Sequence, residues 1–282
     1  MRDAGMCRRG IGLPAQDNSI PPLLLVGCGR MGGALLSGWD AEGLSPSVII
    51  DPAAGGSKFG GHVQVTEAAA VPTGSRFAAV ILAIKPQLAD QAMTAIAPLI
   101  GDAVVLSIMA GRTLAGLRMA LPAAAGLVRA MPNTPAAIGK GISVAVAEHG
   151  VSKLQRDLCD RLLRAAGSVA WVEDEALLDP VTAVSGSGPA YVFLLAELLE
   201  EAGREQGLPA PLARQLARET ITGAGALLAA ADEDAADLRR AVTSPGGTTQ
   251  AALSVLMADD AWPRAVQQAI REATARSRAL AT

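Results

Sequence analysis

The sequence predicts an α/β protein in which a doubly wound parallel sheet is followed by an all-α domain. Three observations predict this order. Apolar runs alternate with helical patterns over roughly the first 170 residues, a glycine-rich turn joins the first run to a helical segment, and no convincing strand follows residue 176. Such alternation is typical of a parallel sheet that helices cover on both faces.

The expected strands are short apolar segments without polar alternation, as in strands that are buried on both faces. They are residues 23–26, SVIID at 47–51, FAAVILAI at 77–84, DAVVLSIMA at 102–110 and GLVRAMP at 126–132. Helical patterns lie between them, including residues 87–99 and 113–120. In the helix that follows the first strand, Ala34, Leu35 and Trp39 share one face.

The second half of the chain has the patterns of helices throughout. Pro189 suits the first turn of a helix, and Gly207 suits its C-terminal stop. Further helical patterns cover about residues 209–231, 248–258 and 263–280. We therefore divide the chain into three parts, which are a loose N-terminal leader at 1–20, a sheet domain at 21–172 and a helical domain at 173–282.

Composition argues against several classes of protein. The 282 residues include 24 Lys plus Arg and 27 Asp plus Glu, a net charge of −3, whereas a nucleic-acid binder normally has a basic face. No apolar run approaches the roughly 18 residues of a membrane span, so we expect no membrane association. The N-terminal segment lacks the apolar centre of a secretory signal.

The cysteines and histidines predict no metal site. Cys7, Cys28 and Cys159 have neither a metal-binding spacing nor a disulfide framework, and His62 and His149 lie far apart in the sequence. We therefore expect no metal, no His-based catalytic relay and a reducing, cytoplasmic location.

The first strand is followed by a turn typical of the Rossmann type of dinucleotide-binding domain. Its pattern is G-x-G-x-x-G, formed by Gly27, Cys28, Gly29, Arg30, Met31 and Gly32. Such glycines allow the backbone to approach a pyrophosphate at a helix N-terminus. Asp51 ends the second strand, where a carboxylate accepts hydrogen bonds from an adenosine ribose and repels a 2′-phosphate. The alternative is a solvated turn residue before Pro52.

Two further segments fall where ligands of open sheets bind, at the carboxyl ends of strands. AIKP, from Ala83 to Pro86, follows the most apolar strand, and Lys85 is either directed at a cofactor or substrate or purely structural. In RAMPNTP, residues 129–135, two prolines fix the backbone around Asn133 and Thr134. This segment is either a binding loop or a rigid connection.

Two stretches of small residues precede helices in the second half, SGSGPAY at 185–191 and SPGGTT at 244–249. Glycines leave the amides of a first helical turn uncovered, and the helix dipole favours an anion there. A small carboxylate fits such a site without any arginine. Each stretch taken alone also fits a simple helix cap.

Together these motifs resemble those of the pyrroline-5-carboxylate reductases. The resemblance covers about residues 22–280 and rests on GCGRMG, AIKP, SIMAG at 107–111, RAMPNTP, SGSGPAYVF and SPGGTT, which occur in the family's order. It implies a Rossmann domain followed by a helical dimerisation domain that interlocks with a second subunit. It also implies a homodimer, and such dimers often assemble into decamers.

The motifs and the resemblance together give a set of candidate residues. The cofactor-binding candidates are Gly27, Gly29, Arg30, Met31, Gly32, Asp51, Ala83, Lys85, Pro86 and Ala110. The substrate-binding candidates are Asn133, Glu175, Gly246, Gly247, Thr248 and Thr249. Thr249 and Ser187 are the catalytic candidates, with Thr249 forming a hydrogen bond to the ring nitrogen of the substrate.

The chain departs from the family's pattern at two places. Relatives usually carry a hydroxyl or basic residue near the end of the second strand and favour NADPH, whereas Asp51 favours NADH. Relatives also often have Lys-Asp shortly before SPGG, where this chain has Arg239 and Arg240. We therefore leave the cofactor as NADPH or NADH and assign no role to the two arginines.

The implied reaction is reduction of the cyclic imine of 1-pyrroline-5-carboxylate to L-proline, the last step of proline synthesis. It needs mainly orientation of the ring and anchoring of the carboxylate, so a helical domain without lysine, histidine or cysteine is compatible with it. A β-hydroxyacid dehydrogenase is an alternative, but its helix-borne lysine is missing after Lys153. A non-catalytic NAD-binding regulator, which binds cofactor without turnover, also remains open.

Overall fold

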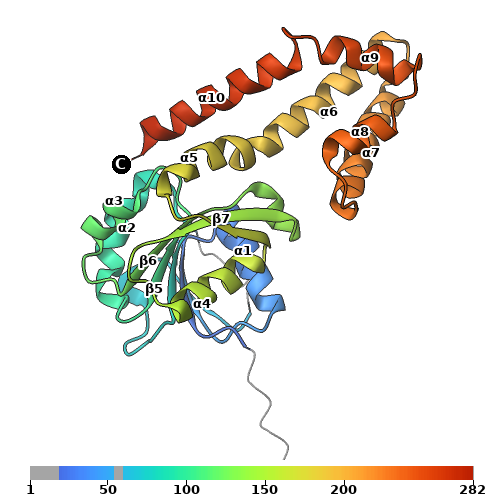
Figure 1. The fold of residues 1–282 in the computed structure, drawn as a ribbon. Coiled ribbons are helices and arrows are strands. Elements are labelled where there is room, and N and C mark those ends of the chain that lie inside the picture. Colours follow the sequence, from blue (N-terminus) through green and yellow to red (C-terminus); the bar gives the residue numbers. More distant parts are fainter. Residues whose placement is uncertain (1–18, 54–59, 282) are drawn as a thin grey trace, which may run out of the picture.

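The computed structural model describes residues 19–53 and 60–281, so the expected leader lies almost entirely outside the described residues. Within these ranges, eight strands form one sheet in the order β3-β2-β1-β4-β5-β6-β7-β8 (Figure 1). The strands are β1 Leu23–Val26, β2 Val48–Ile50, β3 Val63–Val65, β4 Ala79–Leu82, β5 Val104–Ser107, β6 Gly126–Met131, β7 Gly141–Ala147 and β8 Gly167–Trp171.

Helices cover both faces of this sheet, which confirms the predicted doubly wound α/β architecture. They are α1 Arg30–Ala41, α2 Ala89–Ile96, α3 Leu114–Ala120 and α4 Lys153–Arg164. Shorter 3₁₀ turns are η1 Ala68–Ala70, η2 Pro86–Leu88, η3 Ala97–Leu99 and η4 Thr134–Ile138. α1 and α4 pack on one face, and α2 and α3 pack on the other.

The sheet is parallel, as predicted, except at one pair of strands. β7 runs antiparallel to β6, with Met131 opposite Val144, and parallel to β8. The link from Met131 to Gly141 contains only the short turn η4. A parallel connection needs a crossover of about a dozen residues or more, so this chain has to reverse direction.

The core explains why the strands are continuous apolar runs. All four residues of β4 are fully buried, because helices lie above and below them. Trp39 of α1 is also fully buried, and its indole Nε1 donates a hydrogen bond to the Leu162 carbonyl of α4 at 2.7 Å. Burial raises the pKa of the Cys159 thiol to about 12, which marks that cysteine as a packing residue rather than a nucleophile.

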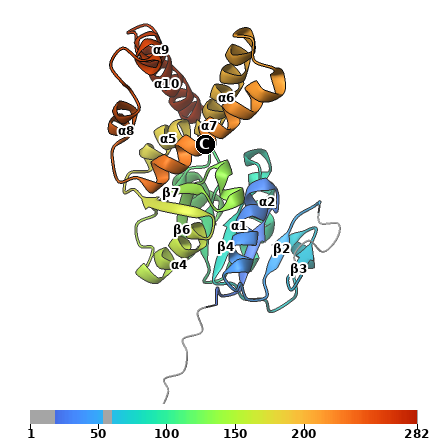
Figure 2. The same ribbon diagram turned by 90° about the vertical axis from the view of Figure 1, so that its right-hand side faces the viewer.

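Residues 175–280 form a helical arm that extends away from the sheet (Figures 1 and 2). α6 packs against α7, and α10 runs back to contact α5 and η6. Its elements are η5 Glu175–Leu177, α5 Leu178–Val181, the π-helical turn η6 Thr182–Gly186, α6 Gly188–Glu205, α7 Ala210–Ala230, α8 Ala235–Ala241, α9 Thr248–Leu256 and α10 Trp262–Leu280. The short helix α8 is not among the predicted helices.

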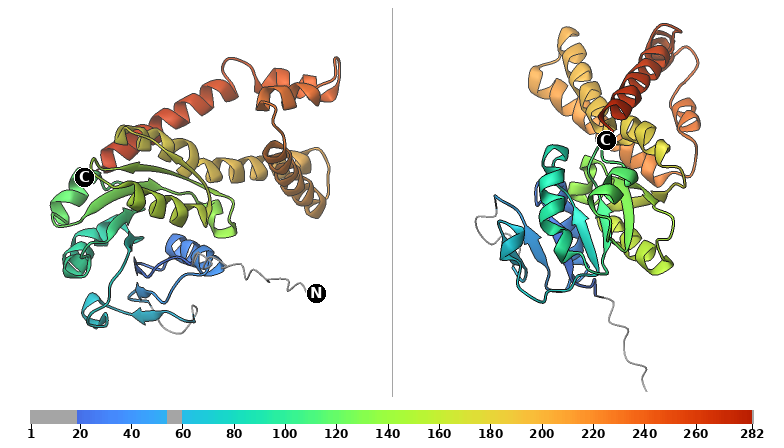
Figure 3. Two further views of the ribbon diagram at one scale, coloured as in Figure 1. Left: turned by 60° about the horizontal axis from the view of Figure 1, so that its bottom comes forward. Right: turned by 90° about the vertical axis from the view of Figure 1, so that its left-hand side faces the viewer.

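The helical arm returns to the sheet domain at its C-terminal end (Figure 3). Gly111, in the loop after β5, has a φ of 74°, and a Cβ on it would lie 2.6 Å from the carbonyl oxygen of Leu280. One turn before Leu280, Ser277 donates a hydrogen bond to Asp179 of α5 at 2.7 Å. The last turns of α10 therefore lie against both the junction of the arm and the loop after β5.

The helical arm has almost no core of its own. Large apolar side chains are exposed along several of its helices, for example Phe193 at 63% and Val266 at 57%. On α6 and α7 the described residues that are fully enclosed are only the small Ala213 and Ala217. Such a surface requires a covering partner, because exposed apolar area of this extent is not typical of an isolated monomer.

One part of this arm has the length and composition of a membrane span. The helical run Glu175–Glu205 has a mean hydropathy of 1.3 over its most apolar window, and only 6% of that window is buried. From the sequence we expect no membrane span, because the chain has no uninterrupted apolar run of that length. The structure shows that a helical run with interspersed polar residues also reaches this hydropathy. Exposed apolar residues also occur on α7, α9 and α10, such as Leu227, Val255 and Val266. The exposure is therefore a property of the whole arm and not of this run alone.

Candidate active site at the carboxyl edge of the sheet

The glycine-rich turn lies between β1 and α1 and is closely packed against the next strand. Gly27 has a φ of 91°, and a Cβ on it would lie 2.7 Å from the Ala83 carbonyl oxygen. A Cβ on Gly32 would lie 2.2 Å from the Gly27 carbonyl oxygen, so a larger residue fits at neither position. α1 begins at Arg30 with Gly29 as its N-cap, and no side chain caps its first amides. This uncovered helix N-terminus fits the pyrophosphate of a dinucleotide.

Asp51 is bound to the same turn. Its Oδ2 accepts a hydrogen bond from the Cys28 amide at 2.6 Å, and its Oδ1 accepts one from the Ala53 amide at 2.8 Å. The carboxylate therefore holds the end of β2 beside the glycine-rich turn. Each carboxylate oxygen has a further lone pair, so these two bonds leave acceptor capacity for a ribose hydroxyl.

The segments after β4 and β5 are neighbours, because the two strands pair in parallel with Leu82 beside Ser107. Lys85 and Ala110 are both exposed there. Arg112 bridges the two segments. One of its guanidinium nitrogens lies 2.9 Å from Asp90 Oδ1, and the other donates to Asp90 Oδ2 at 3.1 Å and to the Pro86 carbonyl at 3.2 Å. No sequence pattern had singled out Arg112.

The RAMPNTP segment lies beside the glycine-rich turn, because η4 packs against α1. Asn133 is the N-cap of η4, and its side-chain Oδ1 accepts a hydrogen bond from the Ile142 amide at 3.0 Å. This bond holds the turn that leads into β7. The amide NH₂ group of Asn133 carries further donors.

Glu175 links the sheet domain to the helical arm. Its Oε1 accepts a hydrogen bond from the Leu114 amide at 2.8 Å and forms an ion pair with Arg129 Nη1 at 2.7 Å. The Arg129 side chain is 4% exposed, and its Nε is buried without a partner among the described residues. Glu175 therefore neutralises a buried guanidinium and ties together β6, α3 and η5. The signal for this pair in the sequence is the single arginine within the apolar run GLVRAM.

Ser187 lies at the start of α6, next to the end of β6. It is the N-cap of α6 without a capping hydrogen bond from its side chain, and its amide donates to the Thr182 carbonyl at 2.8 Å. A Cβ on Gly186 would lie 4.0 Å from Met131 Cγ, which locates SGSG beside RAMP. The preceding π-helical turn is a feature often found at functional sites.

The SPGGTT segment lies elsewhere. Gly247 is the N-cap of α9, and the Gly246 amide donates to Gln250 Oε1 at 2.5 Å, so the turn is held by its own helix. Thr248 and Thr249 open that helix. Both Figure 1 and Figure 2 show α9 at the far end of the helical arm, remote from the sheet.

A single chain thus gathers only part of the predicted site. The carboxyl edge of the sheet brings together the glycine-rich turn, Asp51, AIKP, Ala110, Asn133, Glu175 and Ser187. Gly246, Gly247, Thr248 and Thr249 are not brought to that edge. In the described part of the chain, no group of His, Cys, Asp and Glu has the arrangement of a metal site.

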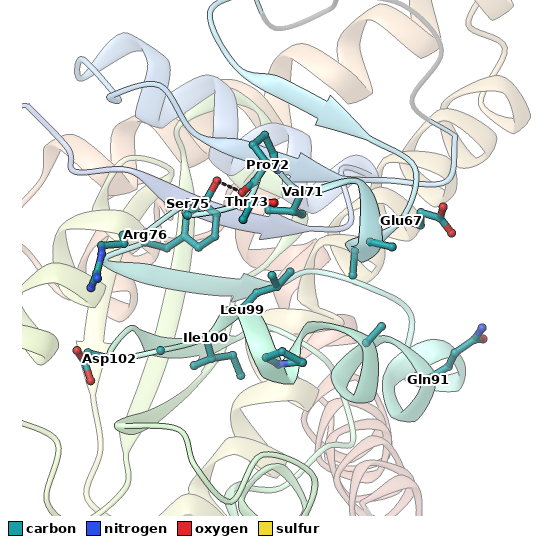
Figure 4. A pocket seen from close by; sticks show the side chains of 17 residues that line it. Glu67, Val71, Pro72, Thr73, Ser75, Arg76, Gln91, Leu99, Ile100 and Asp102 are labelled. Carbon is teal, nitrogen blue, oxygen red and sulfur yellow. Dashed lines mark hydrogen bonds between the residues drawn. The ribbon is translucent and has the colours of Figure 1, made fainter.

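One sizeable cavity lies away from this edge. It has a volume of about 1010 Å³ and lies between residues 67–77 and the segment formed by α2 and η3 (Figure 4). Glu67 and Gln91 lie toward one end of it, and Arg76 and Asp102 lie toward the other. None of the predicted site residues lines this cavity. This cavity is therefore separate from the predicted site.

Two family models match the chain. Residues 175–280 match the model described as pyrroline-5-carboxylate reductase dimerisation, which is the segment of the helical arm. Residues 23–111 match the model described as NADP oxidoreductase, coenzyme F420-dependent, which includes the glycine-rich turn and the segments after β4 and β5.

Individual relatives are similar over nearly the whole chain. The chain is 37% identical to a pyrroline-5-carboxylate reductase of Pseudomonas aeruginosa over 271 residues, covering 93% of this chain and 98% of the relative. A solved pyrroline-5-carboxylate reductase of Coxiella burnetii superposes with a TM-score of 0.84 at 29% identity, covering 94% of this chain and 100% of that one. That of Plasmodium falciparum, with NADP bound, gives a TM-score of 0.79 at 26% identity, covering 93% and 98%.

We predict that Glu175→Ala destabilises the fold through the charge that it leaves behind. Removing one partner of a buried ion pair is costly, and because Glu175 is itself 27% exposed, we expect a loss of about 2–3 kcal/mol in the free energy of unfolding. Urea unfolding at one protein concentration measures this loss. Glu173→Ala is the matched control, because its carboxylate is 91% exposed and lies 3.8 Å from Arg156. Equal urea midpoints for the two variants would contradict the prediction.

Proposed function

The chain belongs to the pyrroline-5-carboxylate reductase family, and from that premise we propose that it reduces 1-pyrroline-5-carboxylate to L-proline with NAD(P)H. The observation that carries the proposal is the packing of Gly27 and Gly32, which leaves the N-terminus of α1 open for a dinucleotide at the same edge of the sheet as RAMP and SGSG. Steady-state oxidation of NADH and NADPH in the presence of pyrroline-5-carboxylate tests it. Cofactor binding without turnover would instead favour a non-catalytic regulator.

The glycine-rich turn, AIKP and the loop at Ala110 are the segments that we propose hold the cofactor. When bound, the nicotinamide supplies the hydride that reduces C5 of the ring. The first amides of α1 would hold the pyrophosphate, and Asp51 would accept hydrogen bonds from the adenosine ribose. The exposed Ala110 would lie beside the nicotinamide, where its small side chain leaves room for a flat ring.

The remaining chemistry consists of orientation and charge complementarity. The ring imine is basic enough to take its proton from water, so no lysine or histidine is required. We propose that Ser187 and the amides at the start of α6 lie beside the ring, and that Asn133 lines the site with its amide NH₂ group. The two contacts of Glu175 support a role next to the site, in which it holds η5 and α3 in place.

We propose that SPGGTT of a second copy completes the site. Within one chain α9 lies far from the sheet, and the exposed apolar residues of the helical arm need a partner. Two interlocked arms would cover these residues and would bring Gly247 and the Thr248 and Thr249 amides of one copy to the sheet of the other. The uncovered first turn of α9 suits the substrate carboxylate. The domain boundary near residue 172 and a cytoplasmic location remain predictions.

We predict that the protein is a homodimer or a larger assembly of dimers at micromolar concentration. The helical arm cannot bury its apolar residues alone, so separation of the copies exposes them to water. Light scattering measures the mass, and about twice the chain mass of 28.6 kDa or a multiple of that value is expected. A decamer would be seen as ten times the chain mass. A stable monomer would contradict the proposed shared site.

We predict that Asp51 favours NADH over NADPH. A carboxylate next to a 2′-phosphate in a partly solvated site costs about 1–2 kcal/mol. Asp51→Ser should therefore raise the NADPH-to-NADH ratio of kcat/KM by roughly 5- to 30-fold. Asp51→Asn separates the two roles of this residue, because it loses the charge but keeps an acceptor for the Cys28 amide. The idea fails if wild type prefers NADPH by more than about tenfold and neither substitution changes the ratio.

We predict that the Thr249 hydroxyl hydrogen-bonds the ring nitrogen as the hydride arrives, with the hydroxyl oxygen accepting from the N–H of the protonated imine. Such a bond to a charged partner contributes roughly 1.5–3 kcal/mol, so Thr249→Ala should lower kcat/KM for pyrroline-5-carboxylate by about 10- to 100-fold. Gly247→Val should be more damaging, since its branched side chain would fill the space that the ring needs. Cofactor affinity should barely change in either variant.

Thr222→Ala is the control for Thr249→Ala. The Thr222 hydroxyl donates to the Arg218 carbonyl of its own helix, and no site role is proposed for it. The Thr222→Ala variant should therefore keep wild-type kcat/KM. If Thr249→Ala also keeps full activity, or if it weakens cofactor binding as much as turnover, the segment is only a helix cap.

A further inference from the structure

The Arg112 guanidinium is held in one defined orientation and not only by charge attraction. Its two terminal nitrogens contact the two carboxylate oxygens of Asp90, and one of them also reaches the Pro86 carbonyl. A planar guanidinium matches a carboxylate in this two-pronged way, whereas a lysine ammonium does not. The Arg112 side chain is 17% exposed and that of Asp90 is 77% exposed. A pair with one partner so exposed adds little stability, so its main effect is on geometry.

The contacts of Arg112 join the segment after β4 to the loop after β5, two segments that are not adjacent in the sequence. Pro86 and Asp90 follow β4 and begin η2 and α2, whereas Arg112 belongs to the loop after β5. On its other side, that loop meets the end of α10, because no Cβ fits between Gly111 and the Leu280 carbonyl. The loop is therefore fixed between α2 and α10, and Arg112 provides the attachment to α2.

The two joined segments are those that we propose hold the cofactor, AIKP and the loop at Ala110. We propose that Arg112 is a positioning residue that sets the spacing between them and thereby the position of the nicotinamide relative to the ring imine. The proposal rests on the proposed function. Hydride transfer needs the reacting atoms at close range, and a misplacement of about 1 Å lowers the rate strongly.

The chain provides a matched control in Arg118. Its guanidinium forms the same kind of fork with Glu148 and also donates to the carbonyls of Leu121, Pro122 and Ala124. Glu148 raises the pKa of Arg118 through this contact. Arg118 lies at the C-terminal end of α3, whereas Ala110 precedes the N-terminal end of that helix. Arg118→Ala therefore removes a two-pronged arginine–carboxylate pair and three contacts to backbone carbonyls away from the proposed site.

The test uses the full chain with Arg112→Ala, Asp90→Ala, the double variant, Arg112→Lys and Arg118→Ala. We expect Arg112→Ala to lower kcat by about tenfold and to raise the dissociation constant of NADH or NADPH by about threefold in calorimetry. Arg112→Lys keeps the charge but loses the fork and should lower kcat by about fivefold. The isotope effect with nicotinamide deuterated at C4 should rise, because the hydride step becomes more limiting. Arg118→Ala should change the urea midpoint but not kcat.

The double variant identifies the contact through which Arg112 acts. If the pair works as a unit, the double variant is no slower than Arg112→Ala, whereas independent effects multiply. The proposal is overturned if the double variant shows multiplied effects, if Arg112→Ala leaves kcat and the cofactor dissociation constant within about twofold of wild type, or if the isotope effect does not rise. A wild type that binds cofactor without turnover refutes the proposed function instead. Calorimetry then decides whether Arg112 still sets the cofactor site.

Discussion

The burial of the central strands on both faces is the constraint on which the rest of the structure depends. Because helices cover β1, β4, β5 and β6 above and below, apolar side chains fill both faces, and polar chemistry is left to the edge where the strands end. The glycine-rich turn meets Ala83 at that edge without room for a side chain, so the first two βα connections form one rigid unit. The same burial explains why Arg129 requires Glu175, since a guanidinium within this core has no access to water.

In the helical arm, by contrast, the apolar side chains are mostly exposed, because its long apolar helices enclose almost no interior. Its junction with the sheet is nevertheless well defined. Glu175 fixes the start of the arm to α3 and β6, and the end of α10 closes on Gly111. The arm is thus held firmly at its base while its far end, with α9, projects from the sheet. That arrangement suits an element that works on a neighbouring molecule.

The sequence was sufficient for features that depend on local pattern. Apolar runs predicted five of the strands, the glycine-rich turn predicted the first βα connection, and Pro189 and Gly207 marked the limits of α6. β3 and β8 were missed because they are only partly buried and lack a continuous apolar run, and β7 because Ser143 interrupts its apolar run. The antiparallel pairing of β7 depends on the length of its connection rather than on its composition.

For the site too, the sequence predicted local motifs but not contacts between residues far apart in the chain. Motifs next to strand ends could be located from the sequence, because the topology of a doubly wound sheet gathers those ends at one edge. The bonds of Arg112 to Asp90 and of Arg129 to Glu175 join residues far apart in the chain, and no periodicity encodes such pairs. The location of SPGGTT at the end of the arm likewise depends on how helices stack, which the helical pattern of each one does not determine.

The separation of α9 from the sheet has a genetic consequence. If each site combines the sheet of one copy with the α9 segment of another, damage to the glycine-rich turn and damage to SPGGTT affect different halves of a shared site. Two defective alleles expressed in one cell then assemble mixed dimers, in which one of the two sites contains both intact halves. Lesions in the two segments complement each other, whereas two lesions within the same segment do not.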